Sequence, residues 1–271
     1  MKKLLTIIII LTASYSGFFL DNGIGLKGAQ LGGAGTAVVN GAEALYWNPA
    51  NLADNYNSNN QAYISYGNKF DDVMEHTFLF KLVLSPESAL GFGYYRLGVD
   101  NITKWDISSQ NIGSMQFINE AMLVGYGIKL NSASRLGITA KNIAQKAVSL
   151  NSYQSVDIGY QTNMGICDLG IVAQDVWNNA LGGQVKPVYR VGTSWKVIMV
   201  RLNVEYAYLS LLEKGYFKSG VIWNLVGIDL KVGYNDYDKN AYAGISFGMI
   251  DYLFTNNEVG TVHQFGLQIE L

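Results

Sequence analysis

The chain has 271 residues, which is enough for one large β domain or two small domains. Only 15% of the residues are charged, against about 25% in soluble domains, and 30 Gly and 18 Tyr accompany only 3 Pro. This composition favours many short strands over disorder, and the net charge of −2 provides no basic surface for nucleic acid. Cys167 is the single cysteine, which excludes an intrachain disulfide and a thiolate metal cluster.

The chain begins with the pattern of an export signal. Lys2 and Lys3 precede an apolar run over residues 4–11, and small residues follow at Ala13 and Ser16. The run is too short for an anchor helix, because crossing the hydrocarbon takes about 20 apolar residues. We therefore expect residues 1–16 to be a cleaved signal peptide.

Two zones follow the signal. Residues 17–60 are rich in Gly, Ala and Asn, whereas residues 61–271 read as one strand after another. The most helix-like stretch, residues 195–212, is interrupted by Lys196, Arg201 and Glu205, so no later segment resembles a membrane-spanning helix.

The strand prediction rests on alternation of side chains with a period of two. In residues 200–208, an apolar set alternates with a mostly polar set: Val200, Leu202, Val204, Tyr206 and Tyr208 against Arg201, Asn203, Glu205 and Ala207. The same pattern recurs over residues 122–130, 135–141, 155–161, 189–196, 227–234 and 264–271.

A soluble β-sandwich also alternates, but two features favour a transmembrane barrel. The polar faces contain many glycines and charges of both signs, which suits a lumen better than a solvated sheet. The apolar faces end in aromatic residues, as membrane-interface girdles require: Tyr94, Tyr95, Tyr160, Trp195, Tyr206, Tyr208, Trp223, Tyr234 and Tyr252.

A sheet in hydrocarbon must close on itself, since each unpaired backbone group there costs several kcal/mol. Counting the alternating segments predicts an all-β fold, a transmembrane antiparallel barrel of about fourteen strands, with twelve as the alternative. The weakest segment lies between Ile102 and Ser108. We expect outer-membrane lipid around this barrel.

The zone before the strands contains two connected motifs. Residues 31–37 read LGGAGTA and residues 44–50 read ALYWNPA, while GTVHQFGL occurs near the end of the chain at residues 260–267. In these motifs the chain resembles the FadL-like superfamily of outer-membrane barrels, and within it the PorV/PorQ family.

This resemblance implies that residues 17–60 fold into the barrel lumen as a plug. The sequence is compatible with that, because Pro49 fixes its own φ and biases Asn48 toward an extended conformation. We expect the plug or gate to be formed by Tyr46, Trp47, Asn48, Pro49 and Ala50.

The alternation also predicts which charged side chains face the lumen: Arg135, Lys141, Asp157, Arg190, Arg201, Glu205, Asp229 and Lys231. They could form a selective pathway, or they could form ion pairs that hold the plug. The even mixture of signs favours ion pairs.

No motif points to catalysis, a cofactor or a metal. Gly23, Gly25 and Gly28 match the spacing of a dinucleotide fingerprint, but a signal peptide stands where the required strand should be. His76 and His263 have no metal-ligand spacing, and no G-x-S-x-G nucleophile motif occurs. We expect a protein without enzymatic activity.

Three functions remain open. The resemblance to FadL-like proteins implies a passive uptake channel for hydrophobic small molecules. The closer PorV/PorQ resemblance implies a component of type IX protein secretion, with secretion-system proteins as partners. A soluble periplasmic β protein is the third possibility. The first is the main prediction, with the outer membrane as the location.

Overall fold

The structure, a computed structural model, describes residues 23–54, 59–70, 73–105, 111–146, 150–180, 185–257 and 260–271. The predicted signal peptide, residues 1–16, lies outside the described residues.

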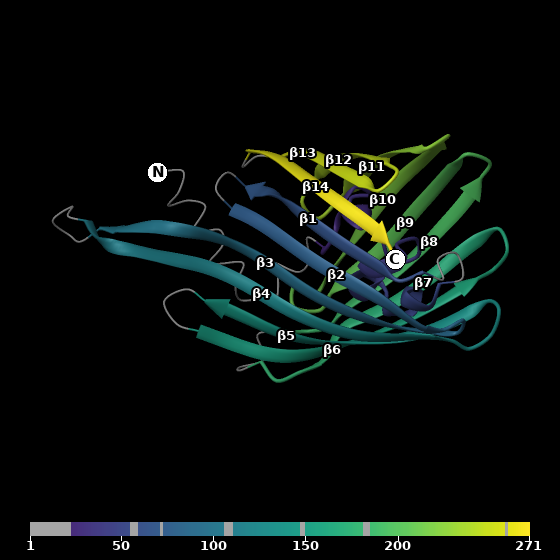
Figure 1. Cartoon of the computed structure of the whole chain (residues 1–271), viewed down its shortest axis with the longest axis horizontal. Helices are drawn as coiled ribbons and strands as arrows, with labels where there is room; N and C mark the ends of the chain where they lie inside the picture. The colour runs from purple at the N-terminus through teal and green to yellow at the C-terminus, as the bar shows by residue number, and fades with distance from the viewer. Residues whose placement is uncertain are drawn as a thin grey trace.

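Fourteen antiparallel strands form one closed barrel (Figure 1). Each strand pairs with its neighbours in the sequence, and β1 closes the barrel on β14 from Gln61↔Glu270 to Gly67↔Gln264. The strands are β1 Gln61–Phe70, β2 Val73–Ser85, β3 Ser88–Trp105, β4 Asn111–Lys129, β5 Ser134–Lys146, β6 Leu150–Asn163, β7 Cys167–Asn178, β8 Val188–Val197, β9 Val200–Leu209, β10 Lys214–Leu225, β11 Ile228–Asn235, β12 Asn240–Phe247, β13 Ile250–Asn257 and β14 Gly260–Glu270. The prediction of a closed barrel with fourteen strands is confirmed.

The two ends of the barrel differ. At the end that holds Gln61 and Glu270, which we call the turn end, two-residue connections occupy positions 86–87, 198–199, 226–227 and 248–249. At the opposite end, β3 and β4 pair as far as Trp105↔Asn111, whereas β2 leaves β3 at Gly98 and β5 leaves β4 at Ile118. Residues 99–105 and 111–117 therefore form a two-stranded ribbon beyond the barrel wall, on the left of Figure 1. The described part of the weak segment, residues 102–105, belongs to this ribbon.

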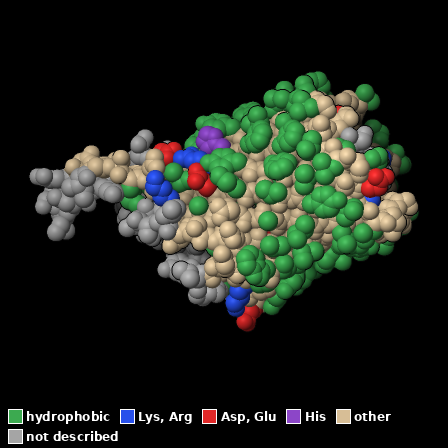
Figure 2. Space-filling view, turned by 60° about the horizontal axis from the view of Figure 1, so that its bottom comes forward, with side chains coloured by type: hydrophobic (Ala, Val, Ile, Leu, Met, Phe, Trp, Pro, Cys, Tyr) green, Lys and Arg blue, Asp and Glu red, His purple; other side chains and the backbone are tan. Residues whose placement is uncertain are grey.

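The exterior is apolar, as alternation predicts. On β9, the outward Leu202 and Val204 are 44% and 47% exposed, whereas the inward Asn203 and Glu205 are 2% and 1% exposed. Figure 2 shows apolar side chains over the middle of one face, with charged side chains toward its ends. Within the described residues, no helix is long and apolar enough to cross a membrane.

The prediction that Tyr95 belongs to the aromatic girdle is wrong. Tyr95 is fully buried and faces inward, whereas its neighbour Tyr94 faces outward and donates a hydrogen bond to Glu120, with 2.7 Å between the oxygens. Adjacent residues of a strand point to opposite faces, so both tyrosines could not belong to one girdle.

Residues 23–54, the N-terminal segment, lie inside the barrel (Figure 1, purple). The segment contains α3 Leu26–Ala29, η1 Gly41–Glu43, α4 Ala44–Trp47 and η2 Pro49–Ala53. Its apolar side chains form a core with inward residues of the wall; this core includes Leu45, Trp47, Leu52, Tyr63, Leu79, Leu123 and Ile143. The inner wall thus contains a large apolar area that the polar-face pattern did not predict.

Glycines of the wall let the segment approach the strands closely. A Cβ at Gly137 would lie 2.2 Å from the carbonyl carbon of Pro49, and one at Gly233 would lie 2.1 Å from the nitrogen of Gly32. Such distances are shorter than any van der Waals contact, so backbone touches backbone at both places.

We expect Gly137→Ala to destabilise the folded protein by about 1–3 kcal/mol, because the methyl group must displace the Pro49 backbone. Gly192→Ala is the matched control, since a Cβ there would lie 3.3 Å from its nearest neighbour and still faces the lumen. Guanidinium unfolding in detergent measures the difference. Equal stabilities would contradict the close packing.

Candidate functional site

Trp47 is the centre of the N-terminal segment. Its ring is fully buried, and its indole N–H donates to the carbonyl oxygen of Ile24 over 2.9 Å. A Cβ at Gly28 would lie 2.2 Å from the ring, and one at Gly35 would lie 2.6 Å from it. The glycine-rich stretch therefore wraps around one tryptophan, which explains why the two motifs occur together.

Asn48 attaches this segment to the wall. Its side-chain nitrogen lies 3.0 Å from the Thr36 carbonyl oxygen, 3.2 Å from the Tyr160 carbonyl oxygen and 3.2 Å from Oε1 of Gln161. Its Oδ1 accepts a hydrogen bond of 3.2 Å from the backbone N–H of Ala50, at the start of η2. Asparagine supplies donors and an acceptor in one short side chain, so it can serve both the wall and the helix cap.

Arg190 of β8 joins the wall to the aromatic residues of the motif. Its guanidinium carbon lies 5.9 Å from the Tyr46 ring centre and 5.7 Å from the Trp47 ring centre. Its Nη1 also lies 3.7 Å from Oε1 of Glu205, whose Oε2 accepts a 2.9 Å hydrogen bond from the Thr36 N–H. One cation thus contacts two rings and a carboxylate that itself binds the segment.

Lys141 of β5 lies between two carboxylates. Its Nζ is 2.7 Å from Oδ1 of Asp157 and 2.7 Å from Oδ1 of Asp175. Asp175 reaches this position because the pairing of β6 with β7 is interrupted between Val156 and Ile158, and Asp175 adopts a φ of 55°. A β-bulge of this kind redirects a side chain that would otherwise follow the alternation.

Six of the eight predicted lumen charges form ion pairs within the described residues. Besides the pairs of Lys141, Asp157, Arg190 and Glu205, the Nη1 of Arg135 lies 2.6 Å from Oδ1 of Asp54, and the Nζ of Lys231 lies 3.5 Å from Oδ1 of Asp251. Arg201 and Asp229 instead line a cavity.

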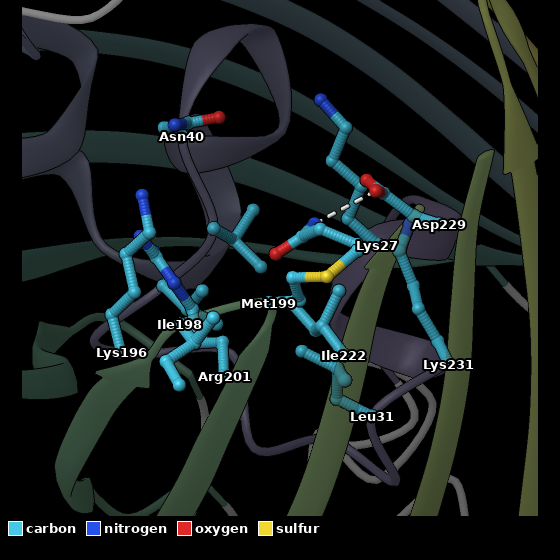
Figure 3. A pocket seen from close by; sticks show the side chains of 13 residues that line it. Lys27, Leu31, Asn40, Lys196, Ile198, Met199, Arg201, Ile222, Asp229 and Lys231 are labelled. Carbon is cyan, nitrogen blue, oxygen red and sulfur yellow. Dashed lines mark hydrogen bonds between the residues drawn. The ribbon is translucent and has the colours of Figure 1, made fainter. Parts of the chain in front are cut away.

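This cavity has a volume of about 470 Å³ and lies at the turn end, between the N-terminal segment and β8–β11 (Figure 3). Asp229 accepts a 2.7 Å hydrogen bond from the side chain of Asn224. A smaller cavity of about 170 Å³ shares Val38, Asn40, Lys196 and Arg201 with it. The larger cavity is lined by Lys27, Leu31, Val38, Val39, Asn40, Lys196, Ile198, Met199, Arg201, Ile222, Asn224, Asp229 and Lys231.

Glu43 is a buried acid that the sequence did not single out. Its Oε2 accepts a 2.9 Å hydrogen bond from the Lys27 backbone N–H, and its Oε1 lies 4.0 Å from the Lys27 ammonium. Burial raises the pKa of Glu43 from 4.5 to about 7, although the charge of Lys27 acts in the opposite direction.

The alternation could not reveal Lys27, Glu43, Asp54 or Asp175. The first three lie outside the strands, and Asp175 faces inward only through its bulge. Within the described residues, no cluster of three or more His, Cys, Asp or Glu side chains could hold a metal ion.

No family model matches the sequence, and no curated protein is similar enough to count as a relative. Solved structures are similar in fold. The P. putida toluene transporter TodX has a TM-score of 0.65 at 11% identity, covering 92% of this chain and 97% of that chain. The Ralstonia pickettii toluene transporter TbuX has a TM-score of 0.62 at 13% identity, covering 93% and 98%. A Pseudomonas aeruginosa FadL homologue has a TM-score of 0.58 at 9% identity, covering 89% and 96%.

At these identities the similarity establishes a shared fold. The chain has the barrel fold of FadL-like proteins, as the resemblance of its motifs implies. The narrower PorV/PorQ resemblance stays a prediction.

We expect Lys141→Met to destabilise the protein by about 3–5 kcal/mol, because two buried carboxylates then face each other without a cation. Lys146→Met, at an exposed position near the end of the same strand, is the control and should change little. Unfolding in denaturant measures both variants. If Lys141→Met lost no more unfolding free energy than Lys146→Met, water must reach the two carboxylates, and the prediction would be contradicted.

The pKa of Glu43 predicts a pH dependence. Between pH 4.5 and about 7 the native state holds a proton that the unfolded state has released, so stability falls as the pH rises through this window. The loss should total about 3 kcal/mol, and Glu43→Gln should abolish it because glutamine stays neutral. Unfolding of both proteins across this range provides the measurement, and identical pH profiles would contradict the burial of the acid.

Proposed function

We propose that the chain is a non-enzymatic outer-membrane channel that takes up hydrophobic small molecules, and that the N-terminal segment is its plug. The observation that carries the proposal is the combination of an apolar exterior, a closed wall and an interior filled by a segment of the same chain. The similarity in fold to structures described as toluene transporters supports it.

The chemistry of the interior suits this role. The core around Leu45, Trp47 and Leu52 consists of apolar side chains from the segment and the wall. An apolar solute that replaced the segment there would meet an apolar surface, and each buried CH₂ group contributes about 0.8 kcal/mol. The polar lipopolysaccharide leaflet slows the entry of apolar solutes, so a channel through the outer membrane would speed their uptake.

Asn48 is the residue we assign to the gate. Its amide joins the motif to the Thr36 loop and to β6 through hydrogen bonds. Pro49 and Ala50 follow on η2, against Gly137 of the wall. Movement of Tyr46, Trp47, Asn48, Pro49 and Ala50 together would open the lumen.

The orientation follows from the connections. Bacterial barrels have short turns on the periplasmic side, so we place the turn end in the periplasm and the β3–β4 ribbon outside the cell.

A component of type IX secretion is the second candidate. The β3–β4 ribbon favours it, because residues 99–105 and 111–117 lie beyond both neighbouring strands and offer a protein partner a surface that short loops would lack. The fold similarity to transporters favours the channel.

An uptake assay tests the proposal in host cells with an intact lipopolysaccharide leaflet and no hydrocarbon channel of their own. Cells that make the protein should accumulate labelled toluene several-fold faster than cells without it, while uptake of arabinose should not change. Toluene uptake equal to the empty host would refute the channel, and co-purification of envelope proteins from such cells would then favour secretion.

The variant Asn48→Ala examines the gate in the same assay. Loss of the amide should loosen the segment, so arabinose permeability should rise. Asn59→Ala removes the same chemical group from an exposed position and should behave as wild type.

A further inference from the structure

Two cations at the turn end differ from the other lumen charges. Lys196 and Arg201 lie directly opposite each other on β8 and β9, one residue from either side of the two-residue turn. Both line the larger cavity (Figure 3) and also the smaller cavity. Like charges placed directly opposite across a strand pair repel each other.

Within the described residues, neither side chain of this basic pair forms an ion pair or a hydrogen bond. The neighbouring cations do have carboxylate partners, in the pairs Lys27–Glu43, Arg135–Asp54 and Lys231–Asp251. Three carboxylates line the two cavities, and all three already accept hydrogen bonds: Asp54 from Arg135 and Asn40, Asp168 from Asn163, and Asp229 from Asn224.

We propose that the basic pair binds a small organic anion, through its carboxylate or phosphate group, at the place where the two cavities meet. The Arg201 guanidinium can donate two parallel hydrogen bonds to such a group, and the Lys196 ammonium adds a mobile positive charge. Asn40 also lines both cavities; its side-chain nitrogen donates to Oδ2 of Asp54 over 3.1 Å and carries a second N–H for the ligand.

The rest of the cavity defines the ligand further. Val38, Met199 and Ile222 give the larger cavity an apolar part. Figure 3 shows Met199 and Ile222 on the same side of the cavity as Arg201. A volume of about 470 Å³ falls in the range of sites for small molecules. The fitting class is an anion with a compact apolar group, such as an aromatic carboxylate or phosphate monoester. This site does not depend on the proposed transport.

Calorimetric titration of the full-length protein in phosphatidylcholine nanodiscs tests the site, with benzoate and phenyl phosphate as anionic probes and benzyl alcohol as the neutral probe. We expect saturable binding of an anionic probe, with a Kd at least tenfold weaker in Lys196→Gln/Arg201→Gln. The control is Lys214→Gln/Lys239→Gln, which removes the same charge from exposed positions at the opposite end and should leave the Kd unchanged. No saturable anion binding, or equal Kd values in the two double variants, would overturn the proposal.

Two further arms complete the test. Lys196→Arg keeps the charge and should keep the affinity, so loss of binding in this variant would also count against the site. Nanodiscs with added phosphatidylglycerol distinguish the source of the anion: competition with the probe identifies a lipid head group, and unchanged binding identifies a soluble anion. Because binding is measured without transport, failure of the uptake assay would leave this result intact.

Discussion

The pairing of β1 with β14 is the constraint on which the rest of the structure depends. In hydrocarbon, a strand edge would leave a row of backbone groups without partners, at several kcal/mol each. Closure from Gln61↔Glu270 to Gly67↔Gln264 removes that edge. It also fixes which side chains face inward, since a shift by one residue would turn Leu202 into the lumen and Glu205 toward lipid.

Glycines and charges of the inner wall have complementary tasks. Gly137 and Gly233 leave room for the backbone of the N-terminal segment, so the segment can lie against the strands. Polar groups buried by that approach then need partners, because burial without one costs free energy. Glu205 binds the Thr36 N–H, and Gln161 reaches the Ala37 carbonyl oxygen over 3.0 Å. Displacing the segment would therefore break polar contacts on several strands together, which makes its position cooperative rather than loose.

Much of the barrel could be predicted from the sequence because period-two alternation is a local signal. It gave the strand number and the inward direction of residues such as Asn203 and Glu205. The alternation did not predict the face of a side chain correctly where the strand is irregular or where the residue type was given more weight than its position in the pattern. Tyr95 is predicted to lie in the outer girdle with Tyr94 but faces inward, and Asp175 turns inward at a bulge that its own sequence does not mark.

The contents of the lumen were harder to predict for a related reason. The family resemblance implies a plug, but the path of the chain between strands decides which charges meet, as Arg135 meets Asp54 and Lys27 meets Glu43. These residues are separated in sequence, and no periodic pattern connects them. The lengths of β3 and β4 were likewise hidden, because an average spacing of strands cannot show that one hairpin extends beyond the wall.

The interior has two chemically different parts, and this difference constrains any solute path. Around Leu45 and Trp47 the contacts are apolar, whereas the cavity at the turn end brings Lys196 and Arg201 together. If hydrophobic molecules enter the lumen as we propose, the apolar part holds them and the basic cavity disfavours them, since an apolar molecule there would displace water from two cations. A straight path to the periplasm is then the less favourable exit, and passage through the wall into the surrounding hydrocarbon is the more favourable one. The same charges that disfavour an apolar solute suit an anion, so the two parts of the interior would select different kinds of molecule.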